Sequence, residues 1–411
     1  MDERRYYGLD ALRGGMMMLG IVLHAALLYM AAPPVDMPIP TDRNNAYTFD
    51  VLFHFIHSFR MPTFFVLAGF FTSLLLEKRG LWGTYKNRGA RVLAPLVAAI
   101  VVILPVTGLF MLDFMLSARF GTHDIWPKLA QVQLFAQELG QKLGHPVDSV
   151  SLGHLWFLYY LCLFYLGIPA YRWLARRSLR FEAGVKKSMA SPAVPLLLGC
   201  LTAATLWTFP GGQVHDSFMY LKPHVPSLIY YGSFFLLGYI FQGYREWLES
   251  ARRWLPWSAA LSLVLFPLSL YLTALDLAAM PQAVGPHAME AYAFGPHLAA
   301  TLAHGLCTWA LIYFCFGFAL RYFDFASPWT LYYSQSSYWV FLIHMPLVAL
   351  AGWWLVQFDL PAIFKFLCVV GFTMLISLVT YHYAVQKTWV SVFLNGQRFN
   401  LNWPWQSSGA N

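Results

Sequence analysis

Arg13 and His24 lie inside residues 9–32, the first long apolar segment of the chain. A charge at the centre of a bilayer costs roughly 2.5–3.5 kcal/mol, so such a residue usually faces a protein interior and has a function. Eleven residues of α-helix make about three turns and rise about 16 Å. We therefore predict that both side chains lie on one face of one helix and line a shared internal tunnel, with Arg13 near the membrane surface and His24 deeper.

Other apolar segments carry histidine, arginine or tryptophan at a similar predicted depth. His57 and Arg60 are three positions apart in residues 48–76, which places them on one broad arc of a helix. Arg60 is permanently charged, which favours an interior role, whereas each histidine is also compatible with a structural hydrogen bond. No carboxylate or cysteine accompanies the close pair His54 and His57, so we predict no metal site. The remaining candidates at this depth are His154, Trp156, His304 and His344.

A pair of arginines, Arg88 and Arg91, follows Lys86 in a basic loop before the third apolar segment. Side chains three apart on the first turn of a helix can hold a phosphate group from two directions, and arginine suits bidentate phosphate contacts. The alternative is that these charges only set the orientation of the chain in the membrane. The pair is thus a candidate phosphate site at the same membrane surface as Arg13.

Composition places the chain among multi-pass membrane proteins. Of its 411 residues, 58% are hydrophobic and only 11% are charged, against about 25% charged in soluble domains. The mean hydropathy is +0.52. The net charge of +8 does not indicate nucleic acid, because the basic residues cluster in particular loops between apolar runs. The five cysteines lie in apolar stretches without paired spacing, so neither a disulfide framework nor a zinc pattern is expected.

Ten apolar stretches are long enough to cross a hydrocarbon core of about 30 Å. Because lipid-exposed backbone must satisfy its own hydrogen bonds, we predict an all-α fold, a polytopic transmembrane helical bundle of about ten spans. One membrane domain would cover residues 1–390, followed by a short cytoplasmic tail at 391–411. The predicted spans are 9–32, 48–76, 92–116, 153–171, 191–209, 225–243, 255–277, 295–320, 328–353 and 361–386.

The basic residues also predict the orientation of these spans. With a cytoplasmic N-terminus, nineteen lysines and arginines fall in the loops on the inside and six in the loops on the outside. Such a bias is typical of membrane proteins with this orientation, and it predicts that both termini are cytoplasmic. The six predicted outside are Arg43, Arg119, Lys128, Lys142, Lys222 and Lys365.

Five motifs together resemble the integral membrane acyltransferase family 3, and in particular its glucan-succinylating branch. The resemblance covers nearly the whole chain, and the set is more specific than any one motif. The motifs are Leu9-Asp10-Ala11-Leu12-Arg13-Gly14 followed by His24, Phe53 to Met61 continuing through Phe64 to Phe71, Arg88-x-x-Arg91, His154-Leu155-Trp156-Phe157-Leu158, and Tyr338-x5-His344-x-Pro346.

This resemblance implies an acyltransferase of the bacterial inner (cytoplasmic) membrane. It would move an acyl group from cytoplasmic acyl-CoA to a hydroxyl of an extracytoplasmic glycan, with succinyl-CoA or acetyl-CoA as donor and no permanently bound cofactor. Succinyl transfer to a periplasmic glucan is the expectation from the branch. O-acetylation of another envelope polysaccharide or of a lipid-linked sugar is the alternative. Arg13, Arg88 and Arg91 would meet the coenzyme A phosphates.

The expected mechanism uses His24 as a general base, because a sugar hydroxyl is a poor nucleophile and imidazole titrates near neutral pH. Arg60 would stabilise the oxyanion, or pair with the free carboxylate of a succinyl donor. An acyl-His24 intermediate is an open variant. The residues expected to contact the substrates, besides the three phosphate-binding arginines, are His57, His154, Trp156, His304 and His344.

Two functions from other classes remain open. Buried charges in a bundle also mark the path of a small-solute transporter, although neither inverted repeats nor paired, Gly/Pro-broken spans are visible. A non-catalytic scaffold for glycan assembly would leave the shared face of Arg13 and His24 unexplained. The expected partners are acyl-CoA, the extracytoplasmic glycan acceptor and the lipid bilayer; we expect no nucleic-acid partner, and the oligomeric state is left open.

Overall fold

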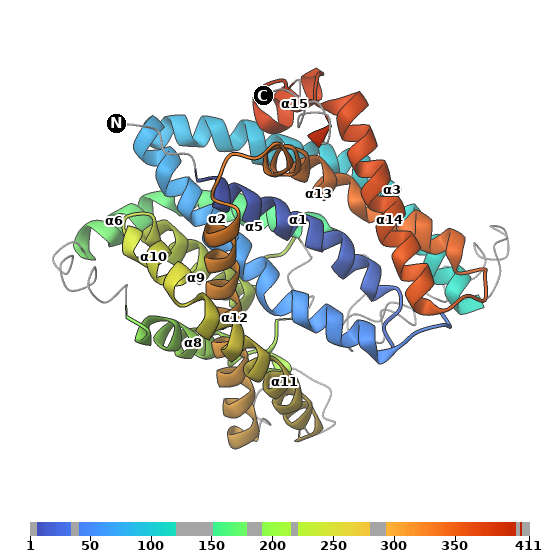
Figure 1. The fold of residues 1–411 in the computed structure, drawn as a ribbon, viewed down its shortest axis with the longest axis horizontal. Coiled ribbons are helices and arrows are strands. Elements are labelled where there is room, and N and C mark those ends of the chain that lie inside the picture. The colour runs from blue at the N-terminus through green and yellow to red at the C-terminus, as the bar shows by residue number, and fades with distance from the viewer. Residues whose placement is uncertain are drawn as a thin grey trace.

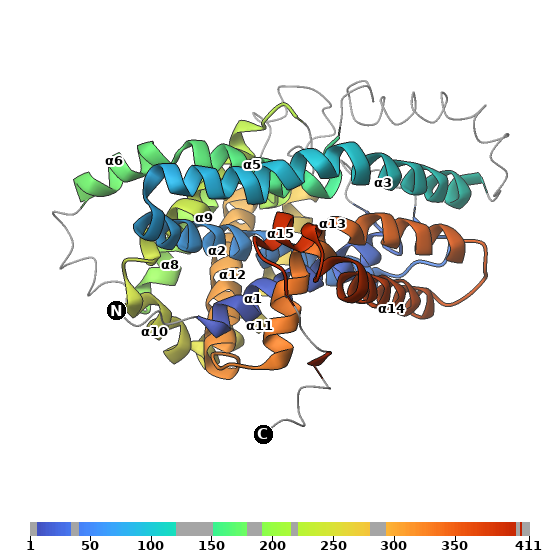
Figure 2. The ribbon, with the colours of Figure 1, turned by 90° about the horizontal axis from the view of Figure 1, so that it is seen from above.

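The computed structural model describes residues 6–33, 41–120, 151–178, 191–214, 221–279, 293–399 and 403–404. Regular structure within these ranges is helical, which confirms the predicted all-α fold there. Figures 1 and 2 show the helices as a bundle in which α1, Tyr7–Leu27, runs through the middle.

The second and third predicted spans form one nearly continuous helical run. Its parts are α2, Tyr47–Arg88, the π-helical turn η1, Gly89–Leu93, and α3, Ala94–Phe120. α2 changes direction at Gly80, whose φ of 66° and ψ of −179° are accessible to glycine alone. The segment that we predicted as a loop between two spans is therefore helical, because one glycine is enough to redirect the chain.

Shorter helices follow, and four long ones complete the bundle. The shorter ones are η2, Gly153–Leu155, α5, Trp156–Leu166, α6, Ile168–Ser178, α8, Ala193–Leu206, η4, Pro210–Gly212, α9, Val225–Phe241, and α10, Arg245–Arg253. The long ones are α11, Leu255–Ala279, α12, Phe294–Tyr322, α13, Pro328–Leu355, and α14, Ala362–Thr380. The π-helical turn η7, Tyr381–Val385, and α15, Trp389–Asn395, then end the regular structure.

The central helix α1 packs against α13, α2 and α12. α2 also packs along α9, and there the two helices approach closely at Gly69 and Gly238. A Cβ on Gly69 would overlap the backbone oxygen of Phe235, and one on Gly238 would overlap that of Val66. Small residues permit such backbone contact between membrane helices. This packing fixes α1 and α2, which carry most of the predicted site, relative to each other and to the rest of the bundle.

Six helices in the described residues are long and apolar enough to cross a membrane, or seven if the bent pair of α9 and α10 counts as one span. One of the six is the run from α2 to α3, Tyr47–Arg119. α5 and α8 have 11 and 14 residues, fewer than the about 20 that a span needs. The structure supports a multi-pass membrane protein, whereas the count of ten spans and the orientation of the termini stay predictions.

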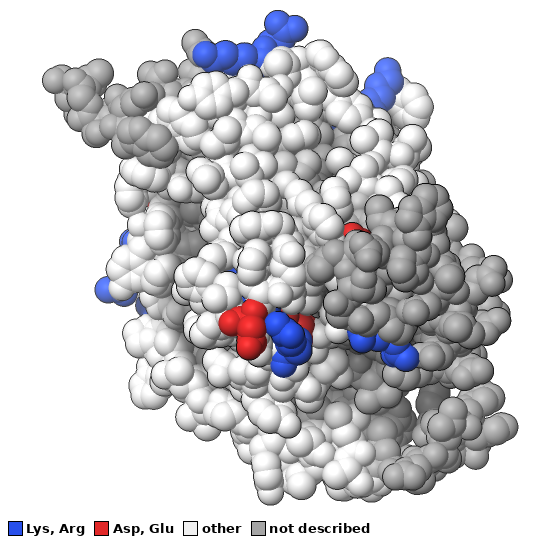
Figure 3. Space-filling view, turned by 90° about the vertical axis from the view of Figure 1, so that its right-hand side faces the viewer, with Lys and Arg blue, Asp and Glu red and all other residues white. Residues whose placement is uncertain are grey.

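One end of the bundle carries the α1–α2 and α13–α14 connections, and Figure 3 views the molecule from that side. Among the described residues, few Lys, Arg, Asp and Glu side chains are visible on this face (Figure 3). This is the end that we predict to be extracytoplasmic, where few basic residues are expected.

Candidate active site

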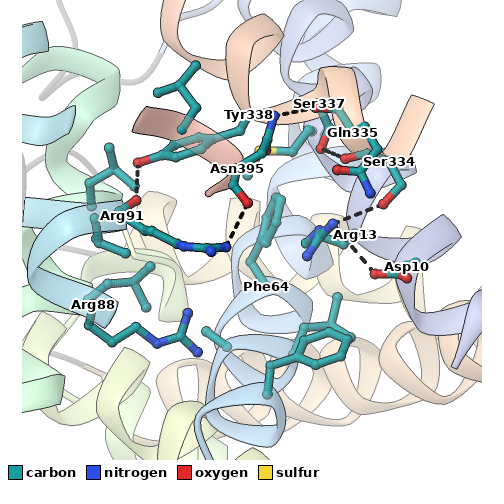
Figure 4. Close-up of a pocket in the computed structure, with 18 of the residues that line it drawn as sticks. Asp10, Arg13, Phe64, Arg88, Arg91, Ser334, Gln335, Ser337, Tyr338 and Asn395 are labelled. Atoms are coloured by element: carbon teal, nitrogen blue, oxygen red, sulfur yellow. Dashed lines mark hydrogen bonds and ion pairs between the residues drawn. The ribbon is translucent and has the colours of Figure 1, made fainter. Parts of the chain in front are cut away.

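Three arginines that are far apart in the sequence meet at one cavity of about 370 Å³. Arg13 comes from α1, Arg88 from the last residue of α2 and Arg91 from η1. Their guanidinium groups point toward the same space beside Phe64 (Figure 4). The volume is within the range of small-molecule pockets. We call this space the arginine cavity; it contains all three residues predicted to bind phosphate.

Arg13 is held in place by two neighbours and still faces the cavity. Its Nη2 donates to the Ser334 hydroxyl of α13 at 2.9 Å and lies 3.5 Å from a carboxylate oxygen of Asp10, one turn away on α1. The Arg13 side chain remains 37% exposed. Because the ion pair is partly open to solvent, an incoming anion can share this guanidinium at modest cost.

We predicted that Arg88 and Arg91 lie on the first turn of a helix, and this is wrong. α2 continues to Arg88, and the π-helical turn η1, which carries Arg91, follows it. The wider turn changes the direction of the side chains, and such turns often occur at functional sites. Arg88 donates to the Thr72 hydroxyl at 3.3 Å, and its guanidinium carbon is 5.2 Å from the centre of the Tyr165 ring. The two arginines thus approach the cavity from different elements.

A polar wall of the cavity was absent from the predicted site residues. The Tyr338 hydroxyl in this wall donates to the backbone oxygen of Arg91 at 2.9 Å. A signal existed in the sequence, since residues 334–337 read Ser-Gln-Ser-Ser inside an apolar segment, and polar groups facing lipid are costly. The polar residues of the wall are Ser334, Gln335, Ser337 and Tyr338 of α13 with Asn395 and Gln397 near the C-terminus. The last two belong to the stretch that we predicted to be a separate cytoplasmic tail.

Three histidines from three separate elements form a second group, which we call the histidine cluster: His24 of α1, His154 of η2 and His344 of α13. The ring centres of His24 and His344 are 5.2 Å apart, and those of His154 and His344 are 5.1 Å apart. Three of our predicted site residues therefore lie in contact, as their similar predicted depth implied.

The hydrogen bonds of the cluster leave lone pairs available. His344 Nδ1 donates to the Phe341 carbonyl at 2.7 Å, and His154 Nε2 donates to the Leu342 carbonyl at 3.2 Å. In a neutral imidazole the other nitrogen is then an acceptor. His344 Nε2, His154 Nδ1 and His24 Nδ1 are all buried without a hydrogen-bond partner among the described residues. A buried acceptor without a partner is compatible with a catalytic role, and here three of them occur on neighbouring rings.

Arg60 of α2 lies beside this cluster and is only 4% exposed. Its Nε donates to the Met16 carbonyl at 2.9 Å, and it is an electrostatic neighbour of His24. The guanidinium rests on Gly20, where a Cβ would overlap Nη2. Within the described part of the chain, no carboxylate lies within ion-pair distance of Arg60. A buried cation without a counter-ion is costly, so this position favours an anionic ligand or transition state.

His24, His154 and His344 do not line the arginine cavity, and the shared tunnel between Arg13 and His24 stays a prediction. Phe64 and Phe157 line the cavity and contact each other with ring centres 5.1 Å apart. Phe157 then contacts Phe341, which contacts both His154 and His344. We call these three phenylalanines, whose ring contacts lead from the cavity to the histidine cluster, the aromatic layer. Sequence periodicity could not reveal the layer, because its members come from three helices.

The remaining predicted residues lie at different distances from the cluster. His57 is an electrostatic neighbour of His24, but its Nε2 donates to the Val214 carbonyl at 2.9 Å and its ring stacks on Phe53. Trp156 packs in an aromatic group with Tyr160 and Tyr231, which favours a structural role. His304 is buried in α12 and does not line the arginine cavity.

Comparison with known proteins agrees with the motifs. The family model described as acyltransferase domain matches residues 6–382. The protein named glucans biosynthesis protein C of Escherichia coli O6:K15:H31 is 25% identical over 402 residues, which cover 93% of this chain and 92% of the relative. Its namesake from Salmonella paratyphi B is 25% identical over 391 residues, covering 92% and 91%. No solved structure matches the chain. The resemblance that we drew from the motifs is thereby confirmed.

Proposed function

The chain belongs to the acyltransferase domain family, and on that basis we propose that it transfers an acyl group from cytoplasmic acyl-CoA to a hydroxyl of an extracytoplasmic glycan. The observation that carries this proposal is the convergence of Arg13, Arg88 and Arg91 on one cavity, on the side of the aromatic layer away from the histidines. The name of the relatives, glucans biosynthesis protein C, favours a glucan as the acceptor.

In this proposal the arginine cavity receives the phosphate groups of the donor. Three guanidinium groups supply several charge-assisted donors in fixed directions, which suits a polyanionic nucleotide. The thioester arm of the donor would extend past Phe64 toward the histidine cluster. The aromatic layer must then part to admit the acyl group and the pantetheine chain behind it, and the buried Arg60 guanidinium beyond the layer would offset the charge of a succinyl carboxylate.

The transfer itself would take place at the histidine cluster. His24 takes the proton of the acceptor hydroxyl while the oxygen attacks the thioester carbonyl. The carbon–sulfur bond then breaks, and the coenzyme A thiolate leaves and takes up that proton. The His344 ring centre is 5.2 Å from that of His24 and its Nε2 has no hydrogen-bond partner among the described residues, so His344 would be a second acceptor for the proton during the step. The variant with a transient acyl group on His24 requires the same groups.

The acyl group that we propose is succinyl, and Arg60 supports it. A guanidinium that is buried without a carboxylate partner in the described residues can pair with the free carboxylate of a succinyl thioester. The same guanidinium can instead stabilise the oxyanion, which would also serve an acetyl donor. Comparison of succinyl-CoA and acetyl-CoA as donors for the wild type and for Arg60→Met separates these roles. Loss of the preference for succinyl in Arg60→Met would assign it to the carboxylate.

The decisive test is mass spectrometry of cell-envelope glycans with and without this protein, combined with acyl transfer by the purified protein. We expect an acyl substituent that depends on the protein, in a cell whose cytoplasmic membrane contains it. His24→Ala should lower turnover by roughly 100-fold or more, since general bases contribute about 10²–10⁴-fold. His224→Ala is a matched control, because that residue lies outside both the cavity and the cluster. A folded His24→Ala protein with near wild-type turnover would refute this mechanism.

Donor binding is tested separately from turnover. Replacing Arg88 and Arg91 together with alanine should weaken coenzyme A binding by roughly 100-fold, because two charge-assisted contacts are lost. Arg252→Ala on the exposed face of α10 is the control. Equal affinities for the double variant and the control would leave Arg88 and Arg91 as charges that only orient the chain in the membrane.

A further inference from the structure

The chain after the last predicted span folds back against the arginine cavity. After η7, Thr388 caps α15, with its side chain accepting from the Val390 amide. The Phe399 amide donates to the Gln386 carbonyl at 2.8 Å, and the Ser391 hydroxyl donates to the Gln397 carbonyl at 2.9 Å. We call residues 386–399 the C-terminal segment. Its hydrogen bonds give it a defined shape of its own.

This segment forms part of the wall of the arginine cavity and is tied to the rest of it. Leu394, Asn395, Gln397 and Phe399 all line the cavity. The Asn395 side chain also donates to the Gln335 carbonyl of α13 at 3.3 Å. Part of the stretch that we predicted to be a short cytoplasmic tail therefore lines the cavity.

The closest contact of the segment is with Arg91. Arg91 Nη1 donates to the Asn395 carbonyl at 2.7 Å (Figure 4). The guanidinium plane lies directly on Gly396, where a Cβ would overlap Nη2 and the guanidinium carbon. A free arginine side chain has about 2 kcal/mol of rotamer entropy to lose on binding a ligand. The Asn395 carbonyl and Gly396 already hold the Arg91 guanidinium in place without a ligand, which lowers the entropy cost of binding.

Gly396 is subject to two structural constraints, one on its backbone conformation and one on the space beside its Cα. It ends α15 in the left-handed region, with φ 80° and ψ 2°, a position where asparagine is also found. It also lies under the Arg91 guanidinium, where any Cβ collides. The colliding atom is the end of a flexible side chain, so a substitution displaces Arg91 at little cost to the fold. The absence of a Cβ at Gly396 therefore affects the position of the Arg91 side chain.

We propose that the C-terminal segment is a working part of the donor site, in which Gly396 and the Asn395 carbonyl position Arg91 for a phosphate group of the donor. This inference rests on the proposed function, because it takes the arginine cavity as the acyl-CoA site. Gly396 is a positioning residue that acts through Arg91.

The test measures coenzyme A affinity and acyl-transfer kinetics of the purified full-length protein. Gly396→Asn keeps a residue that tolerates the left-handed conformation but adds a Cβ, and it should raise the Kd for coenzyme A about tenfold. The KM for the acyl-CoA should rise in parallel, with kcat at saturating donor nearly unchanged. Gly371→Ala, where a Cβ meets nothing within 4 Å, should leave Kd and KM as in the wild type.

A double-variant comparison shows whether the effect passes through Arg91. Arg91→Ala alone should weaken binding, and adding Gly396→Asn to it should cause no further loss. Wild-type affinity in Gly396→Asn, or an equal further loss in the Arg91→Ala background, would overturn the inference. So would an Arg91→Ala protein that binds coenzyme A normally, and in that case the proposed function stands. A wild-type protein that binds no coenzyme A would remove the proposed function, and this inference with it.

Discussion

At the scale of single residues, two arginines of this chain, Arg60 and Arg91, are held in place in the same way. Arg60 and Arg91 each donate to a backbone carbonyl and each lie on a glycine that has no room for a Cβ. For Arg60 the glycine is Gly20, one turn before His24 on α1. The glycine thus leaves space for a guanidinium next to the predicted general base. Arg60, which the sequence predicts to have an interior role, is positioned in the structure by residues of another helix.

Gly20→Ala should therefore displace the Arg60 guanidinium and lower kcat by roughly tenfold or more, since an oxyanion contact contributes about 10²-fold or more. The affinity for coenzyme A should not change, because Arg60 does not line the arginine cavity. Gly15→Ala is the control on the same helix, with nothing within 4 Å of its Cβ. Unchanged turnover in Gly20→Ala would show that the position of Arg60 is irrelevant to the reaction.

At the scale of elements, a buried ion pair joins the segment before α2 to α14. Lys365 Nζ donates to both carboxylate oxygens of Asp42, at 2.8 and 3.0 Å, and both side chains are fully buried. The Asp42 amide in turn donates to the Leu28 carbonyl just after α1. From the sequence we counted Lys365 only as an outside loop charge. The structure shows it as a connection that holds α14 to the end of α1, and so supports the helix that carries His24.

Removing one member of this pair should destabilise the protein, because the other charge would be left buried and alone. Lys365→Met should cost about 3–5 kcal/mol of unfolding free energy. The double variant Lys365→Met with Asp42→Asn should recover part of that loss. Thermal unfolding in detergent measures both, with the exposed Lys78→Met as control. A Lys365→Met protein that melts like the control would mean that the pair contributes no stability.

At the scale of the whole molecule, the proposed function assigns the arginine cavity to the donor on one side of the membrane and the histidine cluster to the transfer deeper in the bundle. The arginine cavity lies toward the predicted cytoplasmic end of α1, and the histidine cluster lies deeper. An acyltransferase that takes its donor from one side and its acceptor from the other needs such a separation.

This arrangement requires the orientation that the basic residues predict. A cysteine at exposed Arg43 should react with a membrane-impermeant maleimide in right-side-out vesicles, and a cysteine at exposed Arg398 should react only after the vesicles are opened. The parent protein, with its five native cysteines, gives the background labelling. The reverse pattern would invert the proposed direction of acyl transfer.

The sequence alone determined the class of the protein and predicted many of the residues that line the arginine cavity or form the histidine cluster. Apolar length and charge bias predict a helical membrane protein, and the spacing of Arg13 and His24 predicts one helical face, because both depend on local periodicity. The grouping of Arg13, Arg88 and Arg91 followed from the predicted topology and the family motifs. His24, His154 and His344 were likewise placed at one depth by counting residues along their helices.

Only the tertiary structure decided how these pieces meet. The polar wall of α13, the aromatic layer, the burial of Lys365 and the return of the C-terminal segment to Arg91 all depend on contacts between residues far apart in the chain. Helical periodicity shows which face of a helix is polar, but not which neighbour it faces. That choice is made by the packing of all the helices together, since each close approach, such as that of Gly69 and Gly238, sets the position of the next helix.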